Sequence, residues 1–256
     1  ATAENLHDRF PALTKARADA YGVASQARYE AARSAGRIEQ DLVPVAIRTA
    51  ESGWGLAVAD EPPRPGTTVE SVADLPTPFR PGGRVSAATS SPLTDGATAC
   101  LLAAEETALD LGLTIGMRLV SYAYAGVDPA VMGIGPVPST QRALELAGLE
   151  IADIDAFEIN EAFAVQVLAF LDAFGIADDD PRVNPDGGAI AVGHPLAASG
   201  VRLMVTLARR FAADPHLRYG ITTMCVGLGQ GATVIWENPH HPDYLAQNQN
   251  RSEAGA

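Results

Sequence analysis

The chain has 256 residues, of which 47% are apolar and 19% are charged. This composition indicates a folded protein with a sizeable core and excludes the disordered and fibrous classes. The net charge of −13 argues against nucleic acid or an anionic membrane as the main partner, and no apolar run is long enough to span a bilayer. Two cysteines are too few for a disulfide framework, so we expect a reducing, cytoplasmic setting.

The first 85 residues predict helices followed by irregular structure. Residues 1–5 are typical of a helix start, and residues 14–35 are rich in good helix formers that stop at Gly36. Residues 42–48 predict a short edge strand, because Pro44 has no N–H to donate to a neighbouring strand. Residues 51–84 contain many prolines and glycines without periodicity and predict an irregular surface connection.

From residue 86 onward, predicted strands alternate with predicted helices. Helices are predicted over 96–111, 138–148, 161–174 and 199–213, and strands over 118–127, 156–159, 218–225 and 231–237. This alternation predicts a layered α/β domain built around a sheet. The polar residues after 237 predict a solvated tail.

Three short segments carry candidate chemistry, and each is expected at the end of a strand, where layered α/β folds place their sites. They are residues 160–163 (Asn-Glu-Ala-Phe), 187–195 (Gly-Gly-Ala-Ile-Ala-Val-Gly-His-Pro) and 225–231 (Cys-Val-Gly-Leu-Gly-Gln-Gly). The glycine spacing of the last segment does not indicate a dinucleotide site, because a strand rather than a helix follows it. The remaining histidines show no metal-ligand spacing.

Taken singly, each segment also has an ordinary structural explanation. Cys225 fits a buried cysteine before a tight turn, although the glycines after it would let a backbone N–H approach a ligand as an oxyanion site requires. His194, held between Gly193 and Pro195, fits either a structural histidine or a general base. Asn160 fits a helix N-cap.

Together, in this order and spacing, the three segments resemble the thiolase family. The resemblance extends from about Thr2 to Glu237. Residues 91–97 (Ser-Pro-Leu-Thr-Asp-Gly-Ala) resemble the family's pantetheine-contacting loop, and residues 132–138 are similar to its fatty-acid β-oxidation branch.

The resemblance implies a thiolase-like layered α-β-α fold. Residues 1–85 would form most of the loop domain that covers coenzyme A, and residues 86–237 the C-terminal half of the core. Residues 238–256 would form a polar tail.

The resemblance also implies roles for individual residues. His194 would activate the acyl-accepting thiolate and help form an oxyanion hole, in which Asn160 would hold a water. Cys225 would exchange a proton with the α-carbon of the acetyl group or with the incoming thiol, and the N–H of Gly227 would contribute to a second oxyanion hole. The substrate coenzyme A would contact Ser91 and Ala87, and no metal or other cofactor is implied.

One departure from the family concerns the nucleophile. In thiolases it is a different cysteine, in the N-terminal half of the core, and nothing in this chain matches it. Cys100 lies within the predicted helix 96–111 and is interpreted as a packing residue. We therefore expect the C-terminal portion of a thiolase that is inactive in thiolysis by itself. In full-length form we expect a homo-oligomer, with other β-oxidation subunits as further partners.

Two other functions stay open at this point. A non-catalytic thiolase-like protein could bind acyl-CoA or lipid, or pair with a separate N-terminal subunit. The presence of Asn160, His194 and Cys225 argues against a purely binding role. A cysteine hydrolase built on the same three residues suits their chemistry, but the wider resemblance argues against it.

Overall fold

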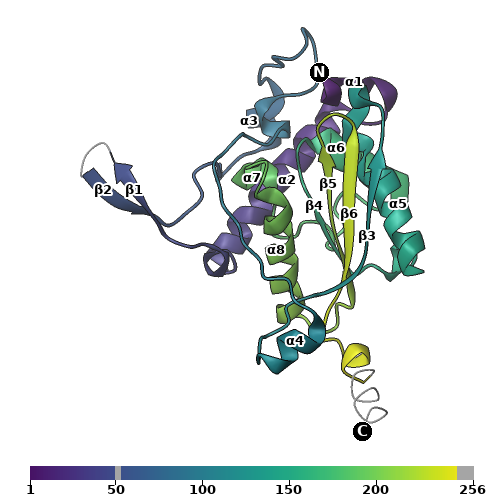
Figure 1. Cartoon of the computed structure of the whole chain (residues 1–256). Coiled ribbons are helices and arrows are strands. Elements are labelled where there is room, and N and C mark those ends of the chain that lie inside the picture. The colour runs from purple at the N-terminus through teal and green to yellow at the C-terminus, as the bar shows by residue number, and fades with distance from the viewer. Residues whose placement is uncertain (50–52, 247–256) are drawn as a thin grey trace.

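The computed structural model describes residues 1–49 and 53–246. Its centre is a four-stranded sheet in the order β3-β6-β5-β4 (Figure 1). The strands are β3 (Arg118–Gly126), β4 (Ala156–Ile159), β5 (Tyr219–Val226) and β6 (Gln230–Glu237). Strands β4 and β5 run parallel, whereas β6 is antiparallel to both of its neighbours. The C-terminal ends of β4 and β5 therefore lie at the same edge of the sheet.

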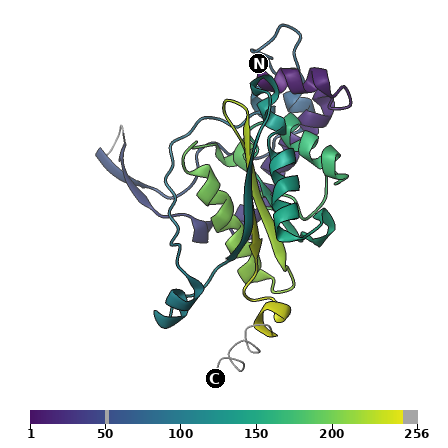
Figure 2. The ribbon, with the colours of Figure 1, turned by 45° about the vertical axis from the view of Figure 1, so that its right-hand side comes forward.

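Helices cover both faces of this sheet. Helices α5 (Pro136–Ala147) and α6 (Ala164–Phe174) pack on one face, and α8 (Ser199–Ala213) packs on the other (Figure 2). The alternation of β5 explains the layers, because Ile221 joins the core with α5 and α6. A Cβ on the preceding residue, Gly220, would meet Leu207 and Phe211 of α8. The layered α-β-α prediction is confirmed.

The N-terminal helices bind to the side of this core. Helix α1 (Thr2–Arg9) is followed by α2 (Lys15–Ser34), whose N-terminus is capped by the Thr14 hydroxyl accepting from Arg17 N at 3.2 Å. The Arg17 guanidinium forms ion pairs with Asp172 and Asp178, each at 2.6 Å. These ion pairs fix α2 along the C-terminal end of α6.

The remaining elements are short. They are η1 (Glu39–Asp41), β1 (Val45–Thr49), β2 (Gly53–Ala57), α3 (Val69–Ala73), η2 (Ala87–Thr89), α4 (Glu105–Asp110), η3 (Pro129–Ile134), η4 (Ile151–Asp153) and α7 (Ala189–Val192). Strands β1 and β2 pair with each other as an antiparallel hairpin that extends away from the body of the molecule (Figure 1). None of the described helices is both long and apolar enough to cross a membrane.

Most of the predicted elements are present within a few residues of their expected bounds. Helix α8 and strand β4 have the predicted bounds, and α5 and α6 end at Gly148 and Gly175, which take left-handed conformations. The predicted edge strand at 42–48 is present as β1. The prediction of an irregular segment over 51–84 was wrong in part, because β2 and α3 lie within it.

The predicted helix over 96–111 was wrong for most of its length. Its last turns form α4, whereas residues 91–104 have no regular structure. Cys100, expected to pack in that helix, is exposed, and so are Leu101 and Leu102. Helix propensity alone rarely holds a short helix without an apolar surface to pack against, and Leu101 and Leu102 stay exposed beside a cavity that Met204 and Trp236 also line.

The expectation of a solvated tail after residue 237 was also wrong in its first part. Asn238 is fully buried, and its side-chain amide donates to three backbone carbonyls, including Leu217 O at 2.8 Å. Tyr244 is buried and hydrogen-bonded to Glu105. Residues 247–256 lie outside the described part of the chain.

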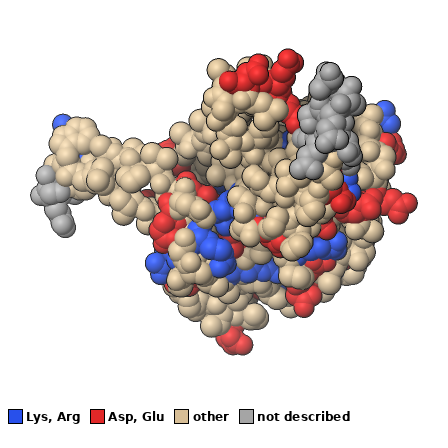
Figure 3. Space-filling view, turned by 90° about the horizontal axis from the view of Figure 1, so that it is seen from below, with Lys and Arg blue, Asp and Glu red and all other residues tan. Residues whose placement is uncertain are grey.

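On the surface, basic side chains lie among the acidic ones, although the net charge of the chain is strongly negative. Figure 3 shows acidic and basic side chains intermixed on the face seen from below. Many arginines of the chain form ion pairs with nearby carboxylates, for example Arg218 with Asp243 at 2.9 Å and Arg182 with Asp180 at 2.8 Å. This face is therefore not a continuous basic surface of the kind that binds nucleic acid.

Candidate functional site

The candidate site lies at the C-terminal ends of β4 and β5. The pair Ile159 and Thr223 are neighbours in the parallel register, and Asn160 N continues it by donating to Thr223 O at 2.9 Å. The other edge of β4 is closed by Asn184, whose side chain accepts from Ile159 N and donates to Ile159 O, both at 2.8 Å. Asn160 is thereby held at a fixed place beyond the strand.

The ordinary structural explanation for Asn160 was a helix N-cap, but Asn160 does not cap a helix. The N-cap of α6 is Phe163. The Asn160 side chain is fully buried instead, and its Nδ2 lies 3.3 Å from Nε2 of His194. Its Oδ1 has no partner among the described residues and is shielded from solvent. The structure thus brings two of the predicted site residues together and leaves one acceptor ready for a water or ligand.

His194 is held by the loop that was expected to contact pantetheine. Its backbone N donates to Pro92 O at 2.9 Å. Gly193 has a φ of +94°, and a Cβ there would lie 2.4 Å from the Thr94 side chain, so the close approach of the two loops requires glycine. The imidazole Nδ1 lies 2.5 Å from the Ser199 hydroxyl at the start of α8.

These contacts select one tautomer of His194. Ser199 Oγ donates to Pro195 O at 3.1 Å, so it accepts from Nδ1–H of the imidazole. Nε2 then carries the lone pair and accepts from Asn160 Nδ2. Burial, followed by the positive charge of Arg202, lowers the pKa of His194. A neutral imidazole whose Nε2 carries the lone pair is the form that a general base needs, and in this structure that lone pair faces Asn160.

Cys225 lies near the C-terminal end of β5, at the same sheet edge. It is two residues beyond Thr223, whereas Asn160 is one residue beyond Ile159, the partner of Thr223. Its thiol is buried, and burial raises its pKa to about 12. The thiol is therefore protonated at neutral pH, which suits a proton donor better than a nucleophile. Gly227 is exposed in the turn between β5 and β6, with open space around its Cα.

Glu161 connects the site to the N-terminal helices. Its carboxylate is fully buried and accepts hydrogen bonds from four donors. They are Tyr21 Oη at 3.0 Å, Ser25 Oγ at 2.6 Å, Asn184 Nδ2 at 3.1 Å and Ile190 N at 3.1 Å. A Cβ at Gly188 would come within 2.4 Å of this carboxyl group. Glu161 therefore connects α2 and the 184–190 turn to the segment that carries Asn160.

Ser91 and Ala87 line a cavity of about 840 Å³ between the core and residues 61–79. Ser91 N donates to Ala162 O at 3.2 Å, which attaches this loop to the segment that carries Asn160. Arg64 is the one basic residue that lines the cavity, and the exposed ring of Phe79 lines it too. The volume of this cavity is sufficient for a large elongated ligand.

Sequence reasoning missed several residues of this site. Ser199, Glu161 and Asn184 hold the imidazole and the motifs in place, and Arg64 faces the cavity. Glu161 stood inside a recognised motif, yet its donors Tyr21 and Ser25 lie more than 130 residues away in the chain. Only the fold brings these groups together.

Comparison with known protein families gives two matches that together span most of the chain. The family described as the N-terminal domain of thiolase matches residues 1–106. The family described as the C-terminal domain of thiolase matches residues 113–238.

Individual relatives are similar over nearly the whole chain. A 3-oxoadipyl-CoA/3-oxo-5,6-dehydrosuberyl-CoA thiolase of Escherichia coli is 43% identical over 92% of this chain and 58% of its own length. A 3-ketoacyl-CoA thiolase of Vibrio vulnificus is 44% identical over 93% of this chain and 62% of its own length. The crystal structure of the Bacillus anthracis acetyl-CoA acetyltransferase matches with a TM-score of 0.87 at 36% identity, over 92% of this chain and 59% of that one. The chain thus spans about three fifths of the length of these relatives.

Proposed function

Because the chain belongs to the thiolase family, we propose that it supplies the coenzyme A cavity and the proton-transfer residues of a 3-ketoacyl-CoA thiolase. The observation that carries this proposal is the chain of contacts from Asn160 through His194 to Ser199, together with the buried thiol of Cys225 on the neighbouring strand β5. The reaction would be thiolytic cleavage of a 3-ketoacyl-CoA into acetyl-CoA and a shortened acyl-CoA, in fatty-acid β-oxidation.

The proposed steps follow from the geometry. Cleaving the bond next to the ketone needs an acyl-carrying nucleophile, a base and places for two oxyanions. His194 Nε2 would accept the proton of the thiol that takes up the acyl group. Asn160 would orient a water in the oxyanion hole that His194 helps to form. The protonated Cys225 would give its proton to the α-carbon of the departing acetyl group. The N–H of Gly227 would bind the second oxyanion.

Coenzyme A itself would lie in the cavity of about 840 Å³. Ser91 and Ala87 would contact the pantetheine arm, and Arg64 would pair with a phosphate, since guanidinium groups bind phosphate oxygens in a bidentate manner. Residues 1–85 would then act as the covering loop domain and residues 86–237 as the core half.

Direct binding tests this placement. The chain should bind coenzyme A in calorimetry, and Ala87→Glu should weaken the affinity by roughly tenfold or more, because it places a carboxylate beside a polyanion. Ala152→Glu, at an exposed position outside that cavity, serves as the matched control and should bind as the unchanged chain does. Equal affinities for the two variants would contradict the placement.

We further propose that this chain does not catalyse thiolysis by itself, because neither of its cysteines fits the role of the nucleophile. Cys225 is held protonated, and Cys100 is exposed in a cavity whose lining does not include His194. When the chain is incubated with coenzyme A and acetoacetyl-CoA, the 3-ketoacyl absorbance should not decrease, because no turnover is expected. Robust turnover would overturn this part of the proposal.

The substrate class has a second candidate. One relative is named for 3-oxoadipyl-CoA, an acyl chain that ends in a carboxylate, so a dicarboxylic thioester is the alternative to a fatty-acyl thioester. Binding of each thioester to the chain distinguishes the two classes. A non-catalytic acyl-CoA-binding role, or completion by a separate N-terminal chain, would be indicated if thioesters bind equally well after Asn160→Ala and His194→Ala.

A further inference from the structure

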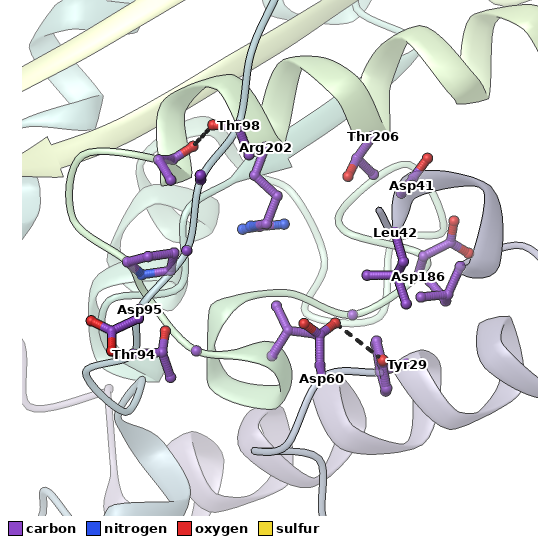
Figure 4. A pocket seen from close by; sticks show the side chains of 18 of the residues that line it. Tyr29, Asp41, Leu42, Asp60, Thr94, Asp95, Thr98, Asp186, Arg202 and Thr206 are labelled. Atoms are coloured by element: carbon purple, nitrogen blue, oxygen red, sulfur yellow. Dashed lines mark hydrogen bonds between the residues drawn. The ribbon is translucent and has the colours of Figure 1, made fainter. Parts of the chain in front are cut away.

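A second, smaller cavity lies between α2, α8 and the 94–98 segment. Its volume is about 180 Å³. Figure 4 shows the Arg202 guanidinium pointing into it from α8, across from Asp60 and Tyr29. The coenzyme A cavity is a different one, although Thr94 lines both.

Unsatisfied polar atoms gather around this smaller cavity. Among the described residues, Arg202 Nε and Nη2, Arg209 Nη2 and Thr94 Oγ1 are shielded from solvent and have no hydrogen-bond partner. All three residues line the cavity. The Arg209 side chain is 9% exposed. Such groups are costly when buried without a partner, so several of them facing one space indicate a missing acceptor.

Four aspartates line the cavity, and none of them supplies that acceptor: they are Asp41, Asp60, Asp95 and Asp186. Asp95 is exposed. Asp41 and Asp186 are paired with Arg209, at 3.0 and 2.7 Å. Asp60 accepts from Tyr29 Oη at 3.3 Å, and burial raises its pKa, which favours the uncharged form. No carboxylate of the described chain lies within ion-pair distance of Arg202 (Figure 4).

The free donors have the geometry of one ligand class. Nε and Nη2 share one edge of the guanidinium, and their parallel N–H bonds match the two oxygens of a carboxylate. The lining also includes the apolar side chains of Ile38, Leu42 and Val192. These side chains suit a short alkyl chain better than phosphate or sulfate, which are polar on every side.

We propose that this cavity is a binding site for a short-chain carboxylate, held in a bidentate manner by Arg202 with the Thr94 hydroxyl beside it. The carboxylate can come from a free small acid or from a Glu or Asp side chain of another polypeptide. Neither Arg202 nor Thr94 transfers a proton in the proposed thiolysis, although Arg202 lies close enough to lower the pKa of His194 and Thr94 also lines the coenzyme A cavity. Binding of a carboxylate here can therefore be measured without turnover.

The test uses the chain itself and propionate as the probe. Titration followed by the ¹⁵N–¹H signal of Arg202 Nε and by thermal unfolding should show saturable binding and a rise in Tm. Propionamide, the uncharged analogue, should show no saturable binding and no rise in Tm at equal concentration. Arg202→Met should raise the Kd for propionate by roughly tenfold or more, because the bidentate pair is lost.

Two further variants keep the test decisive. Arg202→Lys retains the charge without the fork, so it should also weaken propionate binding even if Arg202→Met fails to fold. Arg142→Met removes an exposed arginine of α5 and should leave binding unchanged. Propionate binding that is absent, or that is equal in the chain and in Arg202→Lys, would overturn the proposal.

A peptide separates the two sources of the carboxylate. If acetyl-Ala-Glu-Ala-amide displaces propionate and shifts the Arg202 Nε signal, the cavity admits a polypeptide carboxylate. If only propionate binds, the occupant is a small free acid. Both results support a carboxylate site.

Discussion

A buried carboxylate such as Glu161 is stable because four donors replace the water that it has lost. Two of these donors cannot turn into acceptors. Ile190 N is a backbone amide, and the Asn184 amide is fixed in orientation by its two hydrogen bonds to Ile159. The two oxygens of Glu161 each face one of these fixed N–H groups, so the site requires an acceptor at both positions.

This requirement gives a prediction at the residue scale. Glu161→Gln should destabilise the chain by about 2–4 kcal/mol, because its amide NH₂ must face either Asn184 Nδ2 or Ile190 N whichever way it is turned. Urea unfolding measures the loss. Glu145→Gln, at an exposed position that pairs with Arg142, should cost less than about 0.5 kcal/mol. Equal stability of the two variants would show that Glu161 is not held as described.

The candidate catalytic residues could be selected from the sequence because they stand in short motifs, whereas the residues that hold them in place could not. Asn160 and His194 are contiguous with recognisable neighbours, and the structure places them in contact. Ser199 and Asn184 are ordinary turn and cap residues in the sequence, and their partners depend on the tertiary fold. The role of Arg202 is equally invisible in the sequence, since burial and the absence of a partner are properties of the structure alone.

At the scale of elements, local signals were reliable where a tertiary surface supports them. Helix α8 has an apolar side that packs on the sheet through Leu207 and Phe211, and its bounds follow from the sequence. Residues 96–104 have comparable helix formers, yet Leu101 and Leu102 are each 77% exposed and no helix forms there. Amphipathic burial, rather than propensity, decides which segments become helices.

Two leucines of opposite surroundings test this point. Leu168→Ala in α6 should cost about 2–5 kcal/mol, because the side chain is fully buried between the sheet and the N-terminal helices. Leu101→Ala should change the stability by less than about 0.5 kcal/mol, since the side chain packs against nothing that it would leave empty. Urea unfolding of both variants measures the difference. A large loss in Leu101→Ala would mean that residues 96–104 are packed in solution.

At the scale of the whole molecule, two buried histidines couple the fold to pH. His194 lies in the candidate site and His7 in α1, where its Nδ1 is hydrogen-bonded to Leu13 O. Burial is the largest cause that lowers the pKa of each, and the hydrogen bond to Leu13 only partly offsets it for His7. The N-terminal region and the core thus share the same sensitivity to acid.

The sign of the effect follows from which state binds the proton. Below about pH 6.5 the unfolded chain protonates both imidazoles, whereas the folded chain keeps them neutral until the pH falls to their lowered pKa values. The stability that both imidazoles contribute is complete above about pH 6.5 and is lost as the pH falls below it.

The free energy of unfolding should therefore decrease by about 1–2 kcal/mol between pH 7.5 and pH 5.5. The carboxyl groups whose pKa is lowered by arginines, such as Asp8 and Asp180, lose their contribution in a more acidic range. Urea unfolding at a series of pH values measures the slope, which should become shallower in His194→Gln and stay unchanged in His216→Gln, at an exposed position. An identical slope in His194→Gln would mean that His194 does not stay neutral in the folded protein and would remove the argument for its role as a base.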